Sequence, residues 1–252
     1  MQIISYNING IRAAIRKGFI DWLSEKSVDI ICLQEIKADT TQFETKLFEE
    51  LGYNCFWHPA KKKGYSGVAI LSKKTPKKIS YGCNNAKIDQ EGRIIKAEFN
   101  DIIVYSCYFP SGSSGEIRQE YKMYFLDFFY SYIKKELTKK PIVISGDFNI
   151  CHTEIDIHNP ISNKKTSGFL PEERNWLSAF LELGFIDSFR AKNNQPDHYS
   201  WWSYRANARL RNKGWRIDYH IMSDSLKDEL QDASIMSNVH HSDHCPVYIK
   251  LK

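Results

Sequence analysis

The sequence predicts an α/β layered sandwich, with β-sheets inside and helices outside. Short apolar runs of the kind that form buried strands recur from one end of the chain to the other. Two longer segments carry apolar residues at helical spacing. Because strands and helices do not alternate in a regular βαβ order, a layered sandwich is favoured over a barrel.

The expected strands are short and mostly continuous in their apolar character, which indicates burial on both faces. In chain order they cover Ile3–Ile8, Val28–Leu33, Gly67–Leu71, Ile94–Phe99, Ile102–Tyr108, Ile142–Ile144, Ile217–Met222 and Val247–Leu251.

Two helices are expected. Residues 119–137 repeat apolar side chains at helical spacing, and Pro171 with the acids after it is typical of a helix start, with Gly184 placed to end that helix. The glycine- and serine-rich stretch Ser111–Gly115 is interpreted as an ordered loop rather than a domain hinge. No repeat, linker or low-complexity segment divides the chain, so we expect one catalytic domain over residues 1–252.

Composition places the chain among globular proteins with a large core. It has 252 residues, of which 42% are hydrophobic and 13% aromatic, and disorder is therefore not expected. The net charge of +5 comes from 35 basic and 30 acidic residues, so the surface is mixed but suits an anionic partner.

The cysteines indicate a reducing compartment, because the six are scattered and form no CxxC pair. The first residues read as a strand rather than a signal peptide, and no apolar segment is long enough to span a membrane. We therefore expect a monomeric cytoplasmic protein, associated with the nucleoid if the source is bacterial, with no membrane partner.

Polar side chains arrive at the ends of apolar strands. Asn7, Glu35, Asp147 and Asn149 each follow a run, and Asp218 lies inside another. Any one of them could simply cap a turn or helix. Together they indicate a shared site, because polar groups delivered to an apolar core must be paired, protonated or bound to a metal.

Carboxylates and amides with a single histidine favour a hard, oxygen-preferring cation such as Mg²⁺. A phosphodiester hydrolase needs such a cation, a group that activates water, and donors to the phosphate oxygens. The alternative of a zinc site at His240-His241-Ser242-Asp243-His244-Cys245 lacks a second Cys/His cluster. We expect His240 and His241 to be exposed loop residues.

Motifs along essentially the whole chain resemble the exonuclease III family of abasic (AP) endonucleases. They are Asn7–Ala13, Leu33–Lys37, Gly64–Ala69, Tyr108–Pro110, Gly146–Asn149, Gly214–Tyr219 and Ser242–Pro246. The resemblance implies a four-layered α/β sandwich of the DNase I-like type, in the endonuclease/exonuclease/phosphatase superfamily. Segments around Asn159–Phe169 and Asn207–Arg209 are similar to the branch that includes the major human abasic endonuclease and its bacterial counterparts.

Roles carried over from this resemblance are expectations. Glu35 would be the principal metal ligand, Asp147 would activate the attacking water, and Asn149 would orient that water. Asn7 would position metal ligands or phosphate, and Tyr108 would donate to the phosphate or assist the leaving oxygen. Asn7, Asp147 and Asn149 count as candidate metal ligands too.

His244 would contact the scissile phosphate, with Asp218 behind it to fix its tautomer. Asp243 would orient the centre or bind a second metal. An imidazole held by a carboxylate could also act as the base, but Asp147 is the favoured one.

Three positions depart from the family pattern. Asn9 stands where some members have aspartate, which would weaken a second metal site. Thr166 and Ser111 stand where close relatives often have asparagine, so phosphate contacts there would differ.

The DNA-facing side is expected at Lys61, Lys62 and Lys63 beside a glycine-containing loop. The resemblance adds contacts from Asn163 and Arg209. The lysines between Lys73 and Lys78 are interpreted as a solvated face.

A small pocket for a flipped-out abasic sugar is implied at Trp201, Trp215 and Ile217. Core packing is the alternative for Trp201 and Trp202, whereas Trp215 is favoured as a pocket wall.

The expected function is therefore Mg²⁺-dependent hydrolysis 5′ to abasic sites in duplex DNA, with Mn²⁺ as a substitute. A 3′→5′ exonuclease or 3′-phosphatase activity would accompany it. The alternatives are a phosphoesterase of the same fold that acts on inositol phosphate or phospholipid, and a non-catalytic DNA-binding protein.

Overall fold

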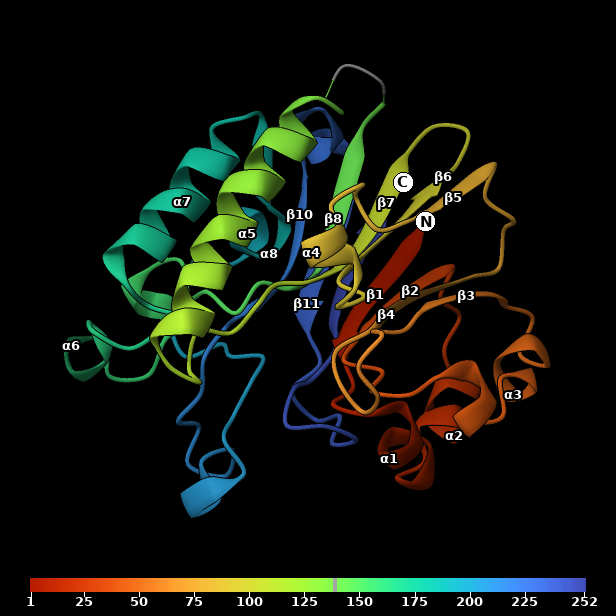
Figure 1. Ribbon diagram of the computed structural model, residues 1–252, viewed down its shortest axis with the longest axis horizontal. Coiled ribbons are helices and arrows are strands. Elements are labelled where there is room, and N and C mark those ends of the chain that lie inside the picture. The colour runs from red at the N-terminus through yellow and green to blue at the C-terminus, as the bar shows by residue number, and fades with distance from the viewer. Residues whose placement is uncertain (138–139) are drawn as a thin grey trace.

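Two six-stranded mixed sheets face each other, and helices cover the outer face of each (Figure 1). The computed structural model describes residues 1–137 and 140–252. The strand order is β11-β12-β1-β2-β4-β3 in the first sheet and β5-β6-β7-β8-β10-β9 in the second. The expected four-layered α/β sandwich is confirmed.

The first sheet brings the two ends of the sequence together. Its strand β1 pairs in parallel with β2 and antiparallel with β12, and Asn7 lies opposite Gln34. The strands are β1 (Gln2–Asn7), β2 (Ile30–Gln34), β3 (Asn54–His58), β4 (Val68–Ser72), β11 (Leu230–Ile235) and β12 (Val247–Leu251).

The second sheet is formed by the middle of the chain. Its register places Tyr108 of β7 opposite Asp147 of β8, and Asp147 opposite Asp218 of β10. The strands are β5 (Lys78–Tyr81), β6 (Ile94–Glu98), β7 (Ile103–Tyr108), β8 (Ile142–Asp147), β9 (Phe185–Asp187) and β10 (Asp218–Ser223).

Helices cover both outer faces. On the side of the first sheet are α1 (Ile11–Arg16), α2 (Phe19–Ser24) and α3 (Lys46–Glu49), and on the side of the second are α5 (Glu116–Lys134) and α7 (Pro171–Leu181) (Figure 1). Shorter helices are α4 (Ala86–Asp89), α6 (Pro160–Asn163) and α8 (Ser188–Lys192). Both expected helices are confirmed, and Ser111–Gly115 is the loop between β7 and α5.

The core forms three apolar layers. The middle layer lies between the sheets, where Ile70 of β4 and Val104 of β7 belong to one buried cluster. The outer layers join each sheet to its helices, as Phe19 does for the first sheet and Phe129 for the second. Each fully buried side chain of this kind contributes about 2–3 kcal/mol, so the sheets form a firm support for the polar groups at their edges.

Of the described residues, no helix is both long and apolar enough to span a membrane.

Candidate active site

Polar side chains from both sheets meet at one edge of the sandwich. Strands β1, β2, β7 and β8 end there, and β10, antiparallel to β8, begins there. Glu35 follows β2 with a φ of 51°, a left-handed turn that redirects the chain at the sheet edge. The expectation that these strand ends share a site agrees with this arrangement.

Asn7 links the two sheets. Its Nδ2 donates to Glu35 Oε1 at 2.9 Å and to Asp147 Oδ2 at 2.8 Å, so both amide hydrogens are used. Its Oδ1 accepts the backbone N–H of Asn9 at 3.0 Å. The side chain is fully buried. This geometry suits Asn7 for positioning the two carboxylates more than for metal ligation.

Asp147 and Asn149 form a closed turn after β8. The backbone N–H of Asn149 donates to Asp147 Oδ1 at 2.8 Å, and its Nδ2 donates to Asp147 Oδ2 at 3.2 Å and to the carbonyl of Phe109 at 3.0 Å. Asn149 has a φ of 52°, a conformation that asparagine tolerates better than most residues. The carboxylate is therefore held in one orientation.

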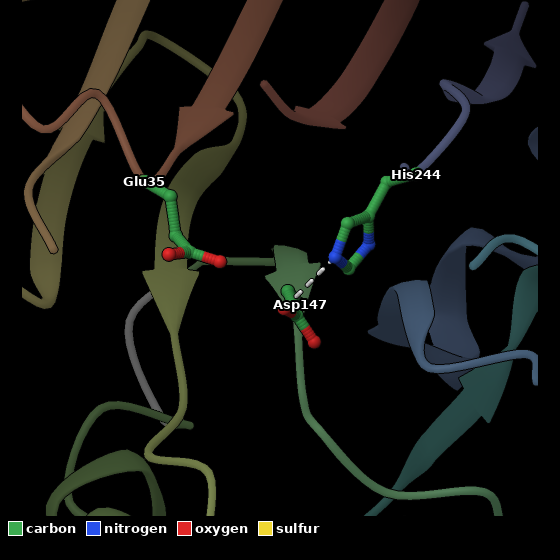
Figure 2. A group of neighbouring side chains, drawn as sticks. All are labelled: Glu35, Asp147 and His244. Carbon is green, nitrogen blue, oxygen red and sulfur yellow. Dashed lines mark ion pairs between the residues drawn. The ribbon is translucent and has the colours of Figure 1, made fainter. Parts of the chain in front are cut away.

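His244 contacts Asp218 through one ring nitrogen and faces Asp147 with the other. Its Nδ1 lies 2.8 Å from Asp218 Oδ2, which also accepts the Ser200 hydroxyl at 2.6 Å. Its Nε2 lies 3.9 Å from Asp147 Oδ2, along the dashed line in Figure 2. The Asp218 contact fixes the tautomer and points Nε2 into the site.

The acids and the histidine perturb one another. Burial, together with Asp218 and Glu35, raises the pKa of Asp147 to about 8. Burial alone would lower the pKa of His244, but Asp218 and Asp147 raise it above its ordinary value. Burial and Glu35 raise the pKa of the Tyr108 phenol, so Tyr108 keeps its proton.

Glu35, Asp147 and His244 form a group that can hold a metal ion. One ligand atom from each lies within 4.8 Å of the others, and the side chains converge from three separate segments (Figure 2). The raised pKa of Asp147 comes first from burial and then from the negative charge of Asp218 and Glu35 beside it. A divalent cation would relieve that charge, so the donor set fits a hard metal.

Asp243 lies beside this group but is engaged elsewhere. Its Oδ1 accepts Asn9 Nδ2 at 2.9 Å, and its Oδ2 accepts Trp201 Nε1 at 3.1 Å. The Asn9 side-chain oxygen accepts Lys37 Nζ in turn, and Lys37 pairs with Glu35 at 2.7 Å. The amide at position 9 thus joins Asp243 to Lys37, a link that a carboxylate could not make with an ionised Asp243.

The expected sugar-pocket residues gather next to His244. Trp201 and Trp215 pack edge to face at 5.9 Å and, with Ile217, join an apolar cluster that includes Ile157 and Phe169. Trp201 also forms a β-bridge with His244. Both rings are half-buried, whereas Trp202 is buried in a neighbouring cluster, as core packing requires.

The expected DNA-facing residues lie farther out. Lys61, Lys62 and Lys63 line a cleft of about 380 Å³ with Tyr65, on the loop whose Ser66 and Gly67 carbonyls accept from the turn after Glu35. Asn163 caps its own turn by donating to the carbonyls of His158 and Asn159.

Arg209, expected to face DNA, and the departures Thr166 and Ser111 make local contacts. The Arg209 guanidinium donates to the carbonyls of Ser237, Val239 and Ser242, and thereby fixes the loop that leads to His244. Thr166 donates to Asn163, and Ser111 contacts Ser113.

One histidine expectation is wrong. His240 is exposed as expected, but His241 is buried, with its ring against Tyr6, Phe19 and Trp22. Aromatic residues on β1 and α2 create this site, and they are too distant in sequence for the local pattern to indicate it.

Sequence reasoning also missed supporting residues. Ser200 binds Asp218 from a distant segment. Lys37 pairs with Glu35, although the Leu33–Lys37 motif in which it stands indicated no role for it. Lys122 had a detectable signal, because it stands on the apolar stripe of α5 with Leu126 and Phe129, where a lysine is unusual.

Comparisons with known proteins agree with this fold and site. The family model described as "Endonuclease/Exonuclease/phosphatase family" matches residues 4–244. An exodeoxyribonuclease of Bacillus subtilis is 46% identical over 98% of both chains. The DNA repair nuclease APEX1 of Danio rerio is 39% identical over 100% of this chain and 82% of its own length.

The solved structure of an AP endonuclease from Archaeoglobus fulgidus superposes with a TM-score of 0.92 at 30% identity, covering 100% of this chain and 99% of the other. These similarities confirm the resemblance to abasic endonucleases that the motifs indicated. The chain belongs to the endonuclease/exonuclease/phosphatase family.

Proposed function

We propose that this chain hydrolyses the phosphodiester bond on the 5′ side of abasic sites in duplex DNA, with Mg²⁺ as cofactor and Mn²⁺ as a substitute. The observation that carries the proposal is the convergence of Glu35, Asp147 and His244 within 4.8 Å, beside an apolar cluster walled by Trp201 and Trp215. Such a site pairs phosphate chemistry with recognition of a small sugar.

In the proposed reaction, water attacks phosphorus, the bond to the 3′ oxygen breaks, and a 3′-hydroxyl and a 5′-deoxyribose phosphate result. Asp147 accepts the proton of the attacking water, and Asn149 orients that water. Asn7 and the Asn149 backbone hold the two Asp147 oxygens, so the base needs little reorganisation as the proton moves.

His244 stabilises the scissile phosphate. The Asp218 carboxylate keeps the imidazole protonated, so Nε2 presents an N–H to a phosphate oxygen. Tyr108, whose raised pKa keeps its phenol protonated, donates to the phosphate or to the leaving 3′ oxygen. Arg93 supports this tyrosine by donating to its carbonyl at 2.9 Å and stacking on its ring.

Glu35, with Asp147 and Asn149 beside it, would hold the magnesium ion. When bound, the ion would neutralise charge that develops on the phosphate oxygens. The same cation would lower the pKa of Asp147 and favour the ionised form that accepts a proton.

Abasic specificity is proposed to come from pocket size. Trp201, Trp215 and Ile217 offer an apolar surface beside His244 that suits a sugar without its base. A normal nucleotide would have to bring its base into the same space and pay to unstack it.

The test uses a duplex with a single tetrahydrofuran abasic analogue and enzyme in excess. We expect cleavage with Mg²⁺, none after EDTA, and recovery when Mg²⁺ or Mn²⁺ is added back. A DNA polymerase should extend the product directly, which identifies a 3′-hydroxyl. Failure to cut, or a 3′ end that requires trimming, would contradict the proposal, and faster release of phosphate from inositol phosphates would favour the alternative substrate class.

A second activity, 3′→5′ exonuclease, is favoured by the similarity to the Bacillus subtilis exodeoxyribonuclease. The same centre would attack a terminal phosphodiester. Release of mononucleotides from a recessed 3′ end, lost in Asp147→Asn, would support it, whereas release that survives this substitution would point to a contaminant.

A further inference from the structure

A buried ion pair lies next to the candidate active site and contacts the turn that carries Asn149. Lys122 of α5 and Glu173 of α7 are both fully buried, and Lys122 Nζ lies 2.7 Å from Glu173 Oε1. Removing two charges from water is costly, and a well-packed apolar pair would often be as stable. The other contacts of the pair therefore indicate its role.

One contact reaches the turn that carries Asn149. Lys122 Nζ donates to the carbonyl oxygen of Asn149 at 2.8 Å. Asn149 has left the β8 ladder with a φ of 52°, so sheet pairing cannot satisfy this carbonyl. The ammonium thus fixes the backbone of a turn whose side chain and N–H both bind Asp147.

Besides Gln119 of α5, Glu173 binds the loop that packs on Trp215. Glu173 Oε2 accepts the backbone N–H groups of Gly168 at 2.6 Å and Leu170 at 3.1 Å. Gly168 lies so close to the Trp215 ring that an added Cβ would be 2.8 Å from it, and its carbonyl accepts the N–H of Cys151. The Glu173 carboxylate therefore holds in place the loop against which the Trp215 ring packs.

An apolar pair could not replace these contacts. The buried Gly168 N–H, and the Asn149 carbonyl and Leu170 N–H of half-buried residues, would lose their partners. Because Lys122 and Glu173 also bind each other, displacement of either loop is transmitted to the other.

We infer that Lys122 and Glu173 are positioning residues that lock the Asn149 turn and the Gly168 loop into one unit, and so keep the water-orienting amide in register with the sugar pocket. This inference rests on the proposed function for the role of Asn149. The contacts themselves do not depend on that function.

The decisive experiment is a double-mutant cycle between Lys122→Met and Asn149→Ala, measured as single-turnover cleavage of the tetrahydrofuran duplex. Lys122→Met should slow cleavage by about 10- to 100-fold, because a displacement of about 1 Å is enough for such a loss. In the Asn149→Ala background the same substitution should slow cleavage clearly less, because the water-orienting amide is already absent and only the backbone contact to Asp147 and the Gly168 loop remain to be disturbed. Equal slowing in both backgrounds would overturn the inference.

Hydrogen exchange without substrate provides a readout independent of activity. In Lys122→Met, backbone amides at 149–151 and 168–170 should exchange faster than in the wild type, while those of β1 and β12 stay unchanged. Ile133→Ala is the matched control, because it removes buried volume from the same helix far from Lys122. It should lower global stability without selectively loosening either loop, and unchanged exchange in Lys122→Met would refute the positioning role.

A variant that does not fold, and a wild type that does not cut abasic DNA, each have a defined interpretation. If circular dichroism shows that Lys122→Met does not fold, Glu173→Gln takes its place, because it preserves the shape of the side chain while removing its charge. The hydrogen-exchange pattern and the double-mutant cycle expected for Lys122→Met then apply to Glu173→Gln. If the wild type folds but does not cut abasic DNA, the proposed function fails, and local exchange alone then supports or rejects the locked unit.

Discussion

At the residue scale, Asp147 serves two opposing requirements. The proposed reaction requires an ionised carboxylate at this position, whereas burial beside Asp218 and Glu35 raises its pKa and penalises the charge. The unfolded chain ionises this group near 3.8 and the folded protein only near 8. Ionisation therefore reduces stability progressively as the pH rises through this window.

We predict that Asp147→Asn abolishes most turnover but stabilises the metal-free protein. Above about pH 8 the substitution removes an unfavourable charge, and a gain of about 1 kcal/mol would raise Tm by roughly 2–4 °C. Thermal unfolding in EDTA at pH 5 and pH 8.5 checks the sign, because the gain should be larger at the higher pH. A lower Tm at pH 8.5 would show that the contacts of Asp147 outweigh its desolvation.

Trp215 gives a separate test of specificity. If its half-buried ring walls the sugar pocket, Trp215→Ala should leave Glu35, Asp147 and His244 in place but admit larger groups. The preference for abasic over undamaged duplex should fall by about 10-fold or more, since a small apolar increment is worth roughly 1–3 kcal/mol.

The measurement compares single-turnover cleavage of the two duplexes by wild type and mutant, after circular dichroism confirms folding. Trp202→Phe is the control, because Trp202 is buried in the adjacent cluster. An unchanged ratio in folded Trp215→Ala would assign the ring to the core.

The grouping of Asn7, Glu35, Asp147 and Asn149 could be predicted because each lies at or just after the end of an apolar strand, and parallel strand ends meet at one edge. The partners that support them were not. Ser200 acts through a contact between segments distant in sequence, and the apolar stripe of α5 marks Lys122 as unusual without indicating that it binds the Asn149 turn.

At the element scale, the strands that sequence analysis missed are the four edge strands β3, β5, β9 and β11. An edge strand has a neighbour on one side only, and these are partly exposed, as in the mixed pattern of Lys78–Tyr81. They lack the continuous apolar runs that marked the eight expected strands, all of which are interior. A strand is therefore predictable from this sequence when it is buried between two neighbouring strands.

The connection between the turn at Glu154–Asp156 and helix α8 depends on a buried charge cluster. Asp156 Oδ1 binds Arg216 Nε at 2.7 Å and Arg190 Nη2 at 2.5 Å, and Arg216 also binds Asp187 at 2.7 Å. Burial alone would raise the pKa of Asp156, but the two arginines hold it below its ordinary value. The cluster fixes the segment that carries Trp215.

We predict that Asp156→Ala costs about 3–5 kcal/mol in the free energy of unfolding, because it leaves buried arginine charge without its partner. Urea denaturation measures the loss. The control is Glu154→Ala on the same turn, which is exposed and should change stability by less than about 0.5 kcal/mol. Equal effects of the two substitutions would mean that the arginines find other acceptors.

At the scale of the whole molecule, positive charge is present at both ends of the sandwich. Lys61, Lys62 and Lys63 lie near the candidate site, whereas Lys74 and Lys77 line a cleft with Met1, at the opposite end of β1. Of these two groups, we expect the first alone to contact DNA that enters the candidate site.

We predict that DNA binding is weakened in the triple variant Lys61→Ala/Lys62→Ala/Lys63→Ala. The slope of the logarithm of the DNA association constant against the logarithm of the salt concentration should fall in magnitude by roughly 2–3, because each lost phosphate contact removes about 0.9. The matched variant Lys74→Ala/Lys77→Ala/Lys78→Ala removes the same charge and should leave the slope near wild type. Fluorescence anisotropy with an abasic duplex in EDTA, over a range of KCl, measures both. Equal losses would indicate a response to net charge alone.

The bridge made by Asn7 has a mechanical consequence. Its one amide touches a carboxylate from each sheet at the edge of the sandwich, whereas the layer between the sheets is mostly apolar, and apolar contacts have no preferred direction. Hydrogen bonds also cross that layer, from Gln34 to Ser106 and between His220 and the carbonyl of Val247. A slide of one sheet over the other would separate Glu35 from Asp147 before it exposed much of the core. Turnover measured under hydrostatic pressure therefore reports displacement of the two sheets at Asn7. It should decline while intrinsic tryptophan fluorescence still reports a folded chain.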